Sequence, residues 1–140
     1  MSVIDLHPAA LTAAAEDIPA GQPVTMLNLL RYRPQAEYGN GSTLPPVSGR
    51  EAYFTRYLPA FDLVAKPYGL SRPVWLGHVT SHLVAPDGAA WDDIALIEYP
   101  DFDIFRAIVT SDAYARNAHP HREAALQDWL FLSASPLQLP

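Results

Sequence analysis

The residue that most invites a chemical interpretation is an asparagine inside an apolar run. Residues 24–33 read VTMLNLLRYR, so Asn28 is flanked on both sides by side chains that favour burial. In a strand, Asn28 would share a face with Met26 and Leu30. A buried carboxamide without partners costs on the order of 1–3 kcal/mol. We therefore expect Asn28 either to satisfy nearby backbone groups or to hold a ligand oxygen in an apolar pocket.

Two histidines four residues apart, His78 and His82, would lie on one face of a strand. Four strand residues span about 13 Å, so this pair cannot bind one metal ion without other ligands. With a hairpin turn centred at 87–88, His82 would lie near Asp93, and His78 near Glu98. His78 is then either a base oriented by Glu98 or half of an ordinary cross-strand polar pair.

The densest polar cluster is the segment His119-Pro120-His121-Arg122. We interpret it as a helix-end group that caps carbonyls or binds an anion. A metal site here would need further ligands that are not evident in the sequence, and the chain has no cysteine to supply one.

Aromatic side chains are the remaining candidates for ligand binding. Such side chains either line a pocket for a flat ligand or belong to the ordinary core, and the candidates are Tyr57, Trp75 and Tyr114. The sequence shows no nucleophile elbow and no glycine-rich phosphate loop. We therefore do not expect a hydrolase triad or a nucleotide-phosphate site.

The composition excludes several function classes. The chain has 140 residues, of which 49% are hydrophobic and 17% charged, as is typical of one globular domain with a substantial core. The net charge is −6 and no basic run is present, which argues against nucleic-acid binding. No apolar stretch approaches the roughly 20 residues of a membrane helix, and the N-terminus has no basic region typical of a secretory signal. The absence of cysteine favours a cytoplasmic protein.

Hydrophobic spacing and helix-cap signals predict the elements that position these candidates. Ser48 and Glu51 form a capping-box pattern at the start of the first long helix, which Pro59 should kink or interrupt. In chain order we expect a helix at 8–16, a strand at 24–32, a polar loop at 34–47, a helix from 48 to 68, strands at 73–85 and 91–99 joined by a turn at 86–88, helix from 100 to 117, a break at 119–120, helix at 122–127 and a strand at 129–134.

This order is β-α-β-β-α-β with an extra N-terminal helix, which is the ferredoxin-like arrangement of the α+β class. We expect a single domain over residues 1–140, with a core at 22–135 and a helical extension at 1–21. The strand at 24–32 is apolar on both faces, whereas helices would cover only one face of the sheet. We therefore expect a second copy of the chain to cover the other face in a homodimer.

Five segments in chain order resemble the dimeric α/β-barrel superfamily, and within it a bacterial family of small proteins of unassigned function: NLLRYR, SGREAYFTRY, VWLGHV, WDDIALIEYPDFDIF and SDAYARNAHPHREAAL. The resemblance covers residues 22–135 and implies a ferredoxin-like fold that dimerises. It also implies pocket roles for His121 and Arg122, because a His-Arg pair is characteristic of that family at this place. The superfamily includes cofactor-free monooxygenases, muconolactone isomerase and haem enzymes, so the resemblance does not specify a reaction.

We expect a cofactor-independent enzyme, monooxygenase-like or isomerase-like, that acts on a small carbonyl-bearing or aromatic metabolite without a metal. Asn28 and Arg122 would polarise an oxygen, and His78 or His121 would move a proton. The alternative is a non-catalytic homodimer that binds a metabolite or another protein, and a third hypothesis is haem binding by an axial histidine. The deciding feature is whether Asn28, the histidines and Arg122 converge on one cavity.

Overall fold

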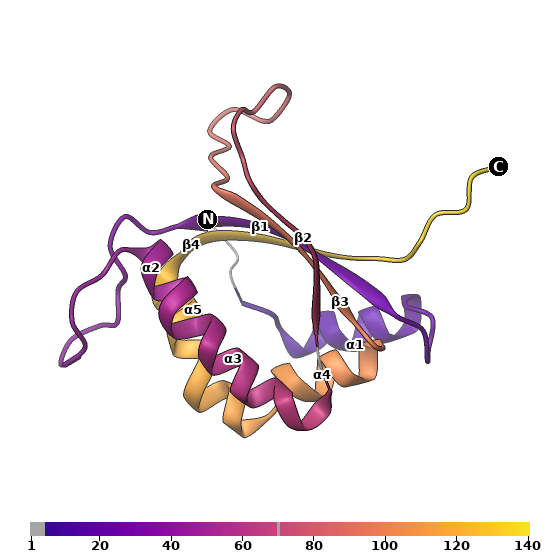
Figure 1. The fold of residues 1–140 in the computed structure, drawn as a ribbon, viewed down its shortest axis with the longest axis horizontal. Coiled ribbons are helices and arrows are strands. Elements are labelled where there is room, and N and C mark those ends of the chain that lie inside the picture. The colour runs from indigo at the N-terminus through magenta and orange to yellow at the C-terminus, as the bar shows by residue number, and fades with distance from the viewer. Residues whose placement is uncertain (1–4, 70) are drawn as a thin grey trace.

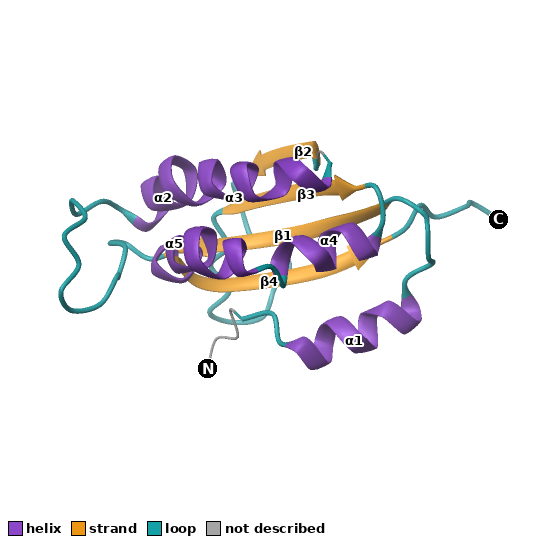
Figure 2. Cartoon of the chain, turned by 90° about the horizontal axis from the view of Figure 1, so that it is seen from below, coloured by secondary structure: helices purple, strands orange, loops and turns teal. Residues whose placement is uncertain are grey.

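The computed structural model describes residues 5–69 and 71–140. Within them, four strands form one antiparallel sheet in the spatial order β2-β3-β1-β4: β1 (Val24–Tyr32), β2 (Arg72–His78), β3 (Asp93–Tyr99) and β4 (Leu126–Ala134). The helices that connect β1 to β2 and β3 to β4 lie against the same face of the sheet (Figures 1 and 2). The ferredoxin-like α+β fold predicted from the sequence is therefore confirmed.

The helices also follow the predicted order. They are α1 (Pro8–Asp17), α2 (Gly49–Ala52), α3 (Leu58–Ala65), α4 (Phe102–Val109) and α5 (His119–Ala125), with π-helical turns at Tyr53–Tyr57 and Tyr114–Ala118 and a 3-10 turn at Lys66–Tyr68. The hydroxyl of Ser48 accepts a hydrogen bond from the Glu51 amide at 3.0 Å, which confirms the Ser48 half of the predicted capping box. The predicted helix at 122–127 is wrong at its end, because β4 already begins at Leu126.

Both proline sites are accommodated by π-helical turns. At Pro59 the α-helix is interrupted as predicted, whereas the predicted break at 119–120 is wrong, because helix continues there into α5. Proline lacks an N–H group and crowds the preceding turn, and one extra residue in that turn relieves both problems. In each case the N–H of the residue before proline bonds five residues back, from Leu58 to Tyr53 and from His119 to Tyr114.

The predicted strand at 73–85 is too long. β2 ends at His78, and residues 79–92 leave the sheet as an extended arm, which rises away from the helices in Figure 1. Leu83 and Val84 in this arm are almost fully exposed, and no further strand lies beside them to extend the ladder. The predicted turn is confirmed, since the Ala89 amide donates to the Pro86 carbonyl at 3.1 Å.

The two faces of the sheet differ in what covers them. Along β1, buried residues alternate with half-buried ones, and the buried set faces the helices. The outer face, which no helix covers, carries apolar side chains from every strand: Leu27, Leu29, Trp75, Ile94, Leu96, Leu130 and Leu132. The second apolar face expected from the sequence is thus present, and the homodimer stays a prediction.

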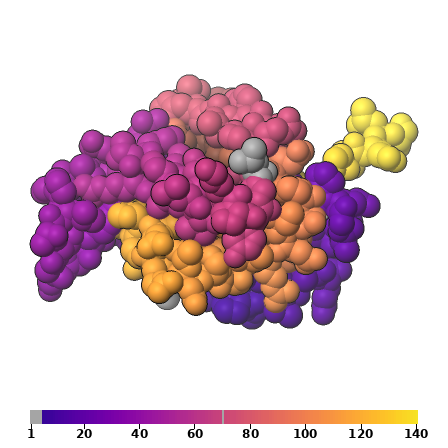
Figure 3. Space-filling model, turned by 60° about the horizontal axis from the view of Figure 1, so that its bottom comes forward, coloured from indigo at the N-terminus to yellow at the C-terminus, as the bar shows by residue number. Residues whose placement is uncertain are grey.

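The remaining segments lie around this core. Helix α1 packs beside α4, where Arg106 Nη2 donates to Thr12 Oγ1 at 3.1 Å. The long loop between β1 and α2 forms one end of the molecule, and the tail after β4 extends from the other end (Figure 3). Among the described residues, no helix has the length and apolar character required to cross a bilayer.

Candidate functional site

A cavity of about 1290 Å³ lies between the inner face of the sheet and the helices. Its walls are mostly apolar and aromatic, with a few polar groups, which is the usual composition of a small-molecule site. Three residues on the inner face of the edge strand β2 are exposed and also line the cavity: Pro73, Leu76 and His78. The cavity therefore opens to the surface along this strand.

The most distinctive polar pair at the opening is His78 with Asp93. Their atoms Nδ1 and Oδ1 are 2.8 Å apart, and the two residues are direct partners across the β2–β3 ladder. A carboxylate can only accept a hydrogen bond, so the neutral imidazole carries its proton on Nδ1 and keeps Nε2 as an acceptor. The His78 side chain is 70% exposed, whereas that of Asp93 is 8% exposed.

The predicted proximity of His78 to Glu98 is wrong. Glu98 lies at the far end of β3, where its carboxylate accepts from Arg72 at 3.0 Å. The sequence-based register placed the ladder close to the turn, but the arm at 79–92 is not part of the ladder. His82, also in the arm, accepts through Nε2 from the Trp91 amide at 3.0 Å and is not near Asp93.

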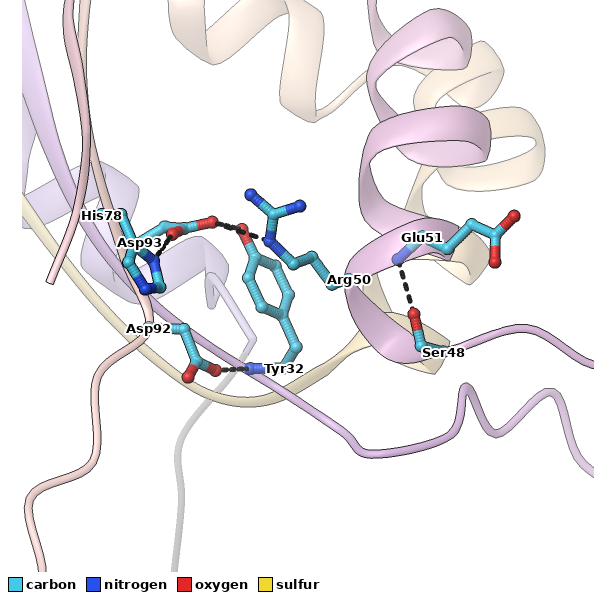
Figure 4. Close-up of polar contacts among 7 residues, drawn as sticks. All are labelled: Tyr32, Ser48, Arg50, Glu51, His78, Asp92 and Asp93. Carbon is cyan, nitrogen blue, oxygen red and sulfur yellow. Dashed lines mark hydrogen bonds and ion pairs between the residues drawn. The ribbon is translucent and has the colours of Figure 1, made fainter. Parts of the chain in front are cut away.

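Three donor groups surround the buried Asp93 carboxylate, as Figure 4 shows. Besides His78, the Tyr32 hydroxyl donates to Oδ2 at 2.7 Å, and Arg50 Nε lies 3.5 Å from the same oxygen. Burial raises the pKa of Tyr32, and its hydrogen bond to Asp93 raises that pKa further. Tyr32 therefore remains a neutral hydroxyl donor at physiological pH.

Sequence reasoning did not assign Tyr32, Arg50 or Asp93 to the site. Asp93 was considered only as a neighbour of His82, because the register of β2 and β3 was placed incorrectly. Polar residues at the ends of two adjacent apolar strands, Tyr32 and Asp93, were the available signal. All three line the cavity.

Asn28 faces the cavity, as expected, and is buried. Its Nδ2 donates to the Ala95 carbonyl at 3.2 Å, and its Oδ1 accepts from Trp129 Nε1 at 2.9 Å. The apolar neighbours of Asn28 in the sequence predict few partners for its carboxamide within the sheet, and this prediction is wrong. The reason is that β4 pairs with β1 and places the indole N–H of Trp129 beside Asn28. One N–H and one oxygen lone pair of Asn28 are still available to a ligand.

Arg122 also lines the cavity and is buried. Its guanidinium carbon lies 4.3 Å from the centre of the Trp129 ring, a distance typical of a cation–π contact. Trp129 thus connects Arg122 to Asn28 on one wall of the cavity. The two residues that the sequence assigned to oxygen binding are therefore brought together.

Two of the three aromatic candidates lie on the helical segments that cover the cavity. Tyr57 and Tyr114 are buried, line the cavity and have their hydroxyl oxygens 3.1 Å apart. Burial raises the pKa of Tyr57 well above its ordinary value, and the neighbouring Tyr114 raises it further. Tyr57 therefore presents a neutral hydroxyl group to the cavity, next to the hydroxyl of Tyr114.

His121 and Trp75 do not lie with the other candidates. The spacing of α5 turns Arg122 inward and His121 toward the long loop, where its Nδ1 lies 2.8 Å from the Tyr38 hydroxyl. Burial lowers the pKa of His121, and the charge of Arg56 lowers it further. Trp75 pairs with Leu96 across the ladder, which places it on the outer face of the sheet. Neither residue lines the cavity.

Sequence reasoning found no further metal ligands near His119. In the described part of the chain, one group of side chains has the spacing to hold a metal ion: Asp5, His119 and Glu123, whose donor atoms lie within 4.8 Å of one another. His119 Nε2 is 3.4 Å from Asp5 Oδ1. Asp5 comes from the segment before α1, and nothing in the sequence near either residue indicates that it lies beside α5.

These observations define a ferredoxin-like α+β protein with a cavity between its sheet and its helices. Among solved structures, the chain is similar to RPA0582, a protein of unknown function from Rhodopseudomonas palustris. The TM-score is 0.83 at 29% identity, and the match covers 99% of this chain and 100% of the other. The methylated form of that protein matches with a TM-score of 0.78 at 29% identity, over 98% and 96% of the two chains.

A Dabb-family protein with a ferredoxin-like fold from Mesorhizobium loti is a more distant likeness. It matches with a TM-score of 0.50 at 8% identity, over 83% of this chain and 98% of the other, and this match supports the fold alone. No protein-family model matches the chain, and no curated protein matches it significantly. The resemblance to ferredoxin-like proteins of unassigned function that the sequence indicated is confirmed.

Proposed function

We propose that the chain is a cofactor-independent enzyme, monooxygenase-like or isomerase-like, that binds a small carbonyl-bearing or aromatic metabolite in the cavity. The observation that supports this proposal is the pairing of an exposed His78 with a buried Asp93 at the opening of an apolar cavity. In this role, His78 Nε2 removes a proton from the bound molecule, and Asp93 holds the ring and stabilises the imidazolium that forms.

The other polar groups of the cavity would bind the oxygen on which negative charge develops. Asn28 on β1 and Arg122 on α5 both contact Trp129, and the hydroxyl pair Tyr57 and Tyr114 comes from the helices. Donors held in an apolar, water-poor space stabilise a developing oxyanion more strongly than donors in water.

A second candidate function is metabolite binding without catalysis in the same cavity. The contacts of Asn28 favour it, because both ends of this carboxamide already bond within the sheet. The two functions require the same ligand site and differ in whether His78 changes the bound molecule.

The test incubates the purified chain with a bacterial metabolite extract and follows the extract by mass spectrometry. The matched control for His78→Ala is His82→Ala, because His82 is exposed, lies four residues away and does not line the cavity. We expect the wild-type chain and His82→Ala to deplete the same metabolite, and His78→Ala to leave it unchanged. A metabolite that co-purifies in native mass spectrometry but is never converted would favour binding without catalysis.

We also propose that the functional unit is a homodimer formed through the outer face of the sheet. All four strands contribute apolar side chains to this face, and two of them, Leu132 and Trp75, are 54% and 53% exposed. An exposed apolar face of this kind is typical of an interface between identical subunits.

A further inference from the structure

We infer that the metabolite bound in the cavity carries a carboxylate, which Arg50 holds at the opening while the apolar part enters the cavity. This inference rests on the proposed function, because it assigns the ligand class of the same site. The observation that supports it is the Arg50 guanidinium group, which contacts Phe54 and Asp93 and is otherwise open toward the cavity.

Two contacts fix the plane of the Arg50 guanidinium. Its carbon lies 4.7 Å from the centre of the Phe54 ring, and its Nε lies 3.5 Å from Asp93 Oδ2. In Figure 4 the dashed contact from Asp93 ends at Nε and not at either terminal nitrogen. Within residues 5–69 and 71–140, these two nitrogens have no hydrogen-bond or ion-pair partner, and Arg50 lines the cavity.

A pair of N–H groups held in one plane matches the two oxygens of a carboxylate. A neutral carbonyl offers only one oxygen and would therefore bind only one of the two terminal N–H groups of Arg50. A phosphate could also bind such a fork, but its second negative charge would be repelled by Asp93, which already lies beside Arg50. The arrangement therefore favours a singly charged carboxylate.

The position of Arg50 also gives the orientation of the ligand. The Arg50 side chain is 60% exposed, so a carboxylate bound to it stays near water and avoids the cost of burying a charge. The interior beyond it is lined by Leu58, Phe61 and Phe105, which suit an apolar or aromatic body. His78 contacts the same Asp93 carboxylate as Arg50 and therefore lies beside the part of the ligand next to its carboxylate.

The test compares two probes of nearly equal shape, 2-naphthoate and 2-naphthamide, by isothermal titration calorimetry. The variants are Arg50→Met, Arg50→Lys and the matched control Arg72→Met. Arg72 is 68% exposed and ion-paired to Glu98, but it does not line the cavity. Arg72→Met therefore removes the same charge from a similar ion pair at another place.

We expect the wild-type chain and Arg72→Met to bind 2-naphthoate about tenfold more tightly than 2-naphthamide, as a charge-assisted two-point contact implies. Arg50→Met should bind both probes equally, and Arg50→Lys should recover part of the preference, because lysine keeps the charge but not the fork. A preference that survives in Arg50→Met, or equal affinities in the wild type, would overturn the carboxylate assignment and leave the cavity proposal standing.

Two further outcomes are decisive. If neither probe binds the wild-type chain, the proposed ligand site itself is wrong, and the carboxylate assignment with it. If Arg50→Met fails to fold by its denaturant midpoint, Arg50→Lys decides the question, since an undiminished preference in that variant would overturn the two-point contact.

Discussion

Single polar residues on the inner face of the sheet connect strands and line the cavity at the same time. Asn28 on β1 accepts from Trp129 on β4, and Asp93 on β3 accepts from Tyr32 on β1 and from His78 on β2. Each link satisfies polar atoms that burial would otherwise leave unpaired. Substitutions at these positions therefore affect stability as well as any ligand.

Replacing Asn28 with leucine should destabilise the fold by about 1–3 kcal/mol, because Trp129 Nε1 loses its acceptor. The measurement is the denaturant midpoint against wild type, with an unchanged slope to show that the unfolding transition is comparable. Asn117→Leu is the matched control, since Asn117 is exposed and surface changes usually stay within about 0.5 kcal/mol. An Asn28→Leu midpoint equal to wild type would instead indicate that water replaces these contacts and that Asn28 is kept for a ligand.

The group of Asp5, His119 and Glu123 provides a second test at single residues. Both carboxylates are exposed, and His119 already pairs with Asp5. We expect the purified chain to carry neither a stoichiometric metal nor the Soret band of a haem, as elemental analysis and absorption spectroscopy would establish. Stoichiometric zinc or iron that disappears in His119→Ala would contradict this expectation and locate the metal.

At the scale of elements, the ends of β1 and α5 and the start of α2 meet at Gly49. The Gly49 amide donates to the Arg33 carbonyl at 3.0 Å, and the Arg33 amide donates to the Ala125 carbonyl at 2.8 Å. A Cβ on Gly49 would lie 2.5 Å from the Ala125 carbonyl oxygen and closer still to that of Arg33. This junction positions the next residue, Arg50.

Gly49→Ala should destabilise the protein by about 1–3 kcal/mol, because the added methyl group overlaps two backbone oxygens. Intrinsic helix propensity favours alanine over glycine by about 1 kcal/mol, so any loss must come from this overlap. The unfolding midpoint measures the effect, and Glu51→Ala, an exposed position in the same helix, should leave that midpoint almost unchanged. A Gly49→Ala variant as stable as wild type would show that β1, α2 and α5 can move apart enough to accommodate the methyl group without loss of stability.

At the scale of the whole molecule, burial of tyrosines makes stability depend on alkaline pH. Burial raises the pKa of the following residues above the ordinary value of about 10: Tyr32, Tyr53, Tyr57 and Tyr99. The folded chain keeps these protons, whereas the unfolded chain releases them above about pH 10. The stability that they contribute is therefore complete below about pH 10 and is lost as the pH rises.

We expect the urea midpoint to fall steeply between about pH 10 and pH 11. Each such tyrosine lowers the free energy of unfolding by up to about 1.4 kcal/mol per pH unit in this range. Tyr57→Phe removes one of these groups and should make the decline less steep, whatever it does to stability at neutral pH. A midpoint that stays constant through this range would mean that the tyrosines ionise without unfolding the chain.

The outer face of the sheet leads to a prediction about assembly. We expect a homodimer at micromolar concentration, and Leu132→Glu should convert it to a monomer by placing a charge in the apolar interface. Leu63→Glu is the matched control, because Leu63 is an exposed leucine on α3, on the helical side of the molecule. Light scattering measures the mass, and a wild-type monomer at all concentrations would contradict the proposed dimer.

The sequence by itself determined the order of elements, the helix caps and the two-faced character of the sheet. These features depend on residues close together in the chain. The alternation in 24–32 sets which side chains share a face, and Ser48 caps a helix through an amide only three residues away. For the same reason, alternation placed Asn28 on the face of Met26 and Leu30, whereas Arg122 was assigned to a pocket only by the family resemblance; both line the cavity.

Only the tertiary structure decided which polar groups meet in the candidate site. His78 pairs with Asp93 because the ladder between β2 and β3 stops short of the turn, and no local pattern reports where a ladder stops. Arg50 reaches Asp93 across more than forty residues of chain, and Trp129 reaches Asn28 across about a hundred. Such contacts depend on strand register and on helix packing, both of which are set by the fit of the whole core.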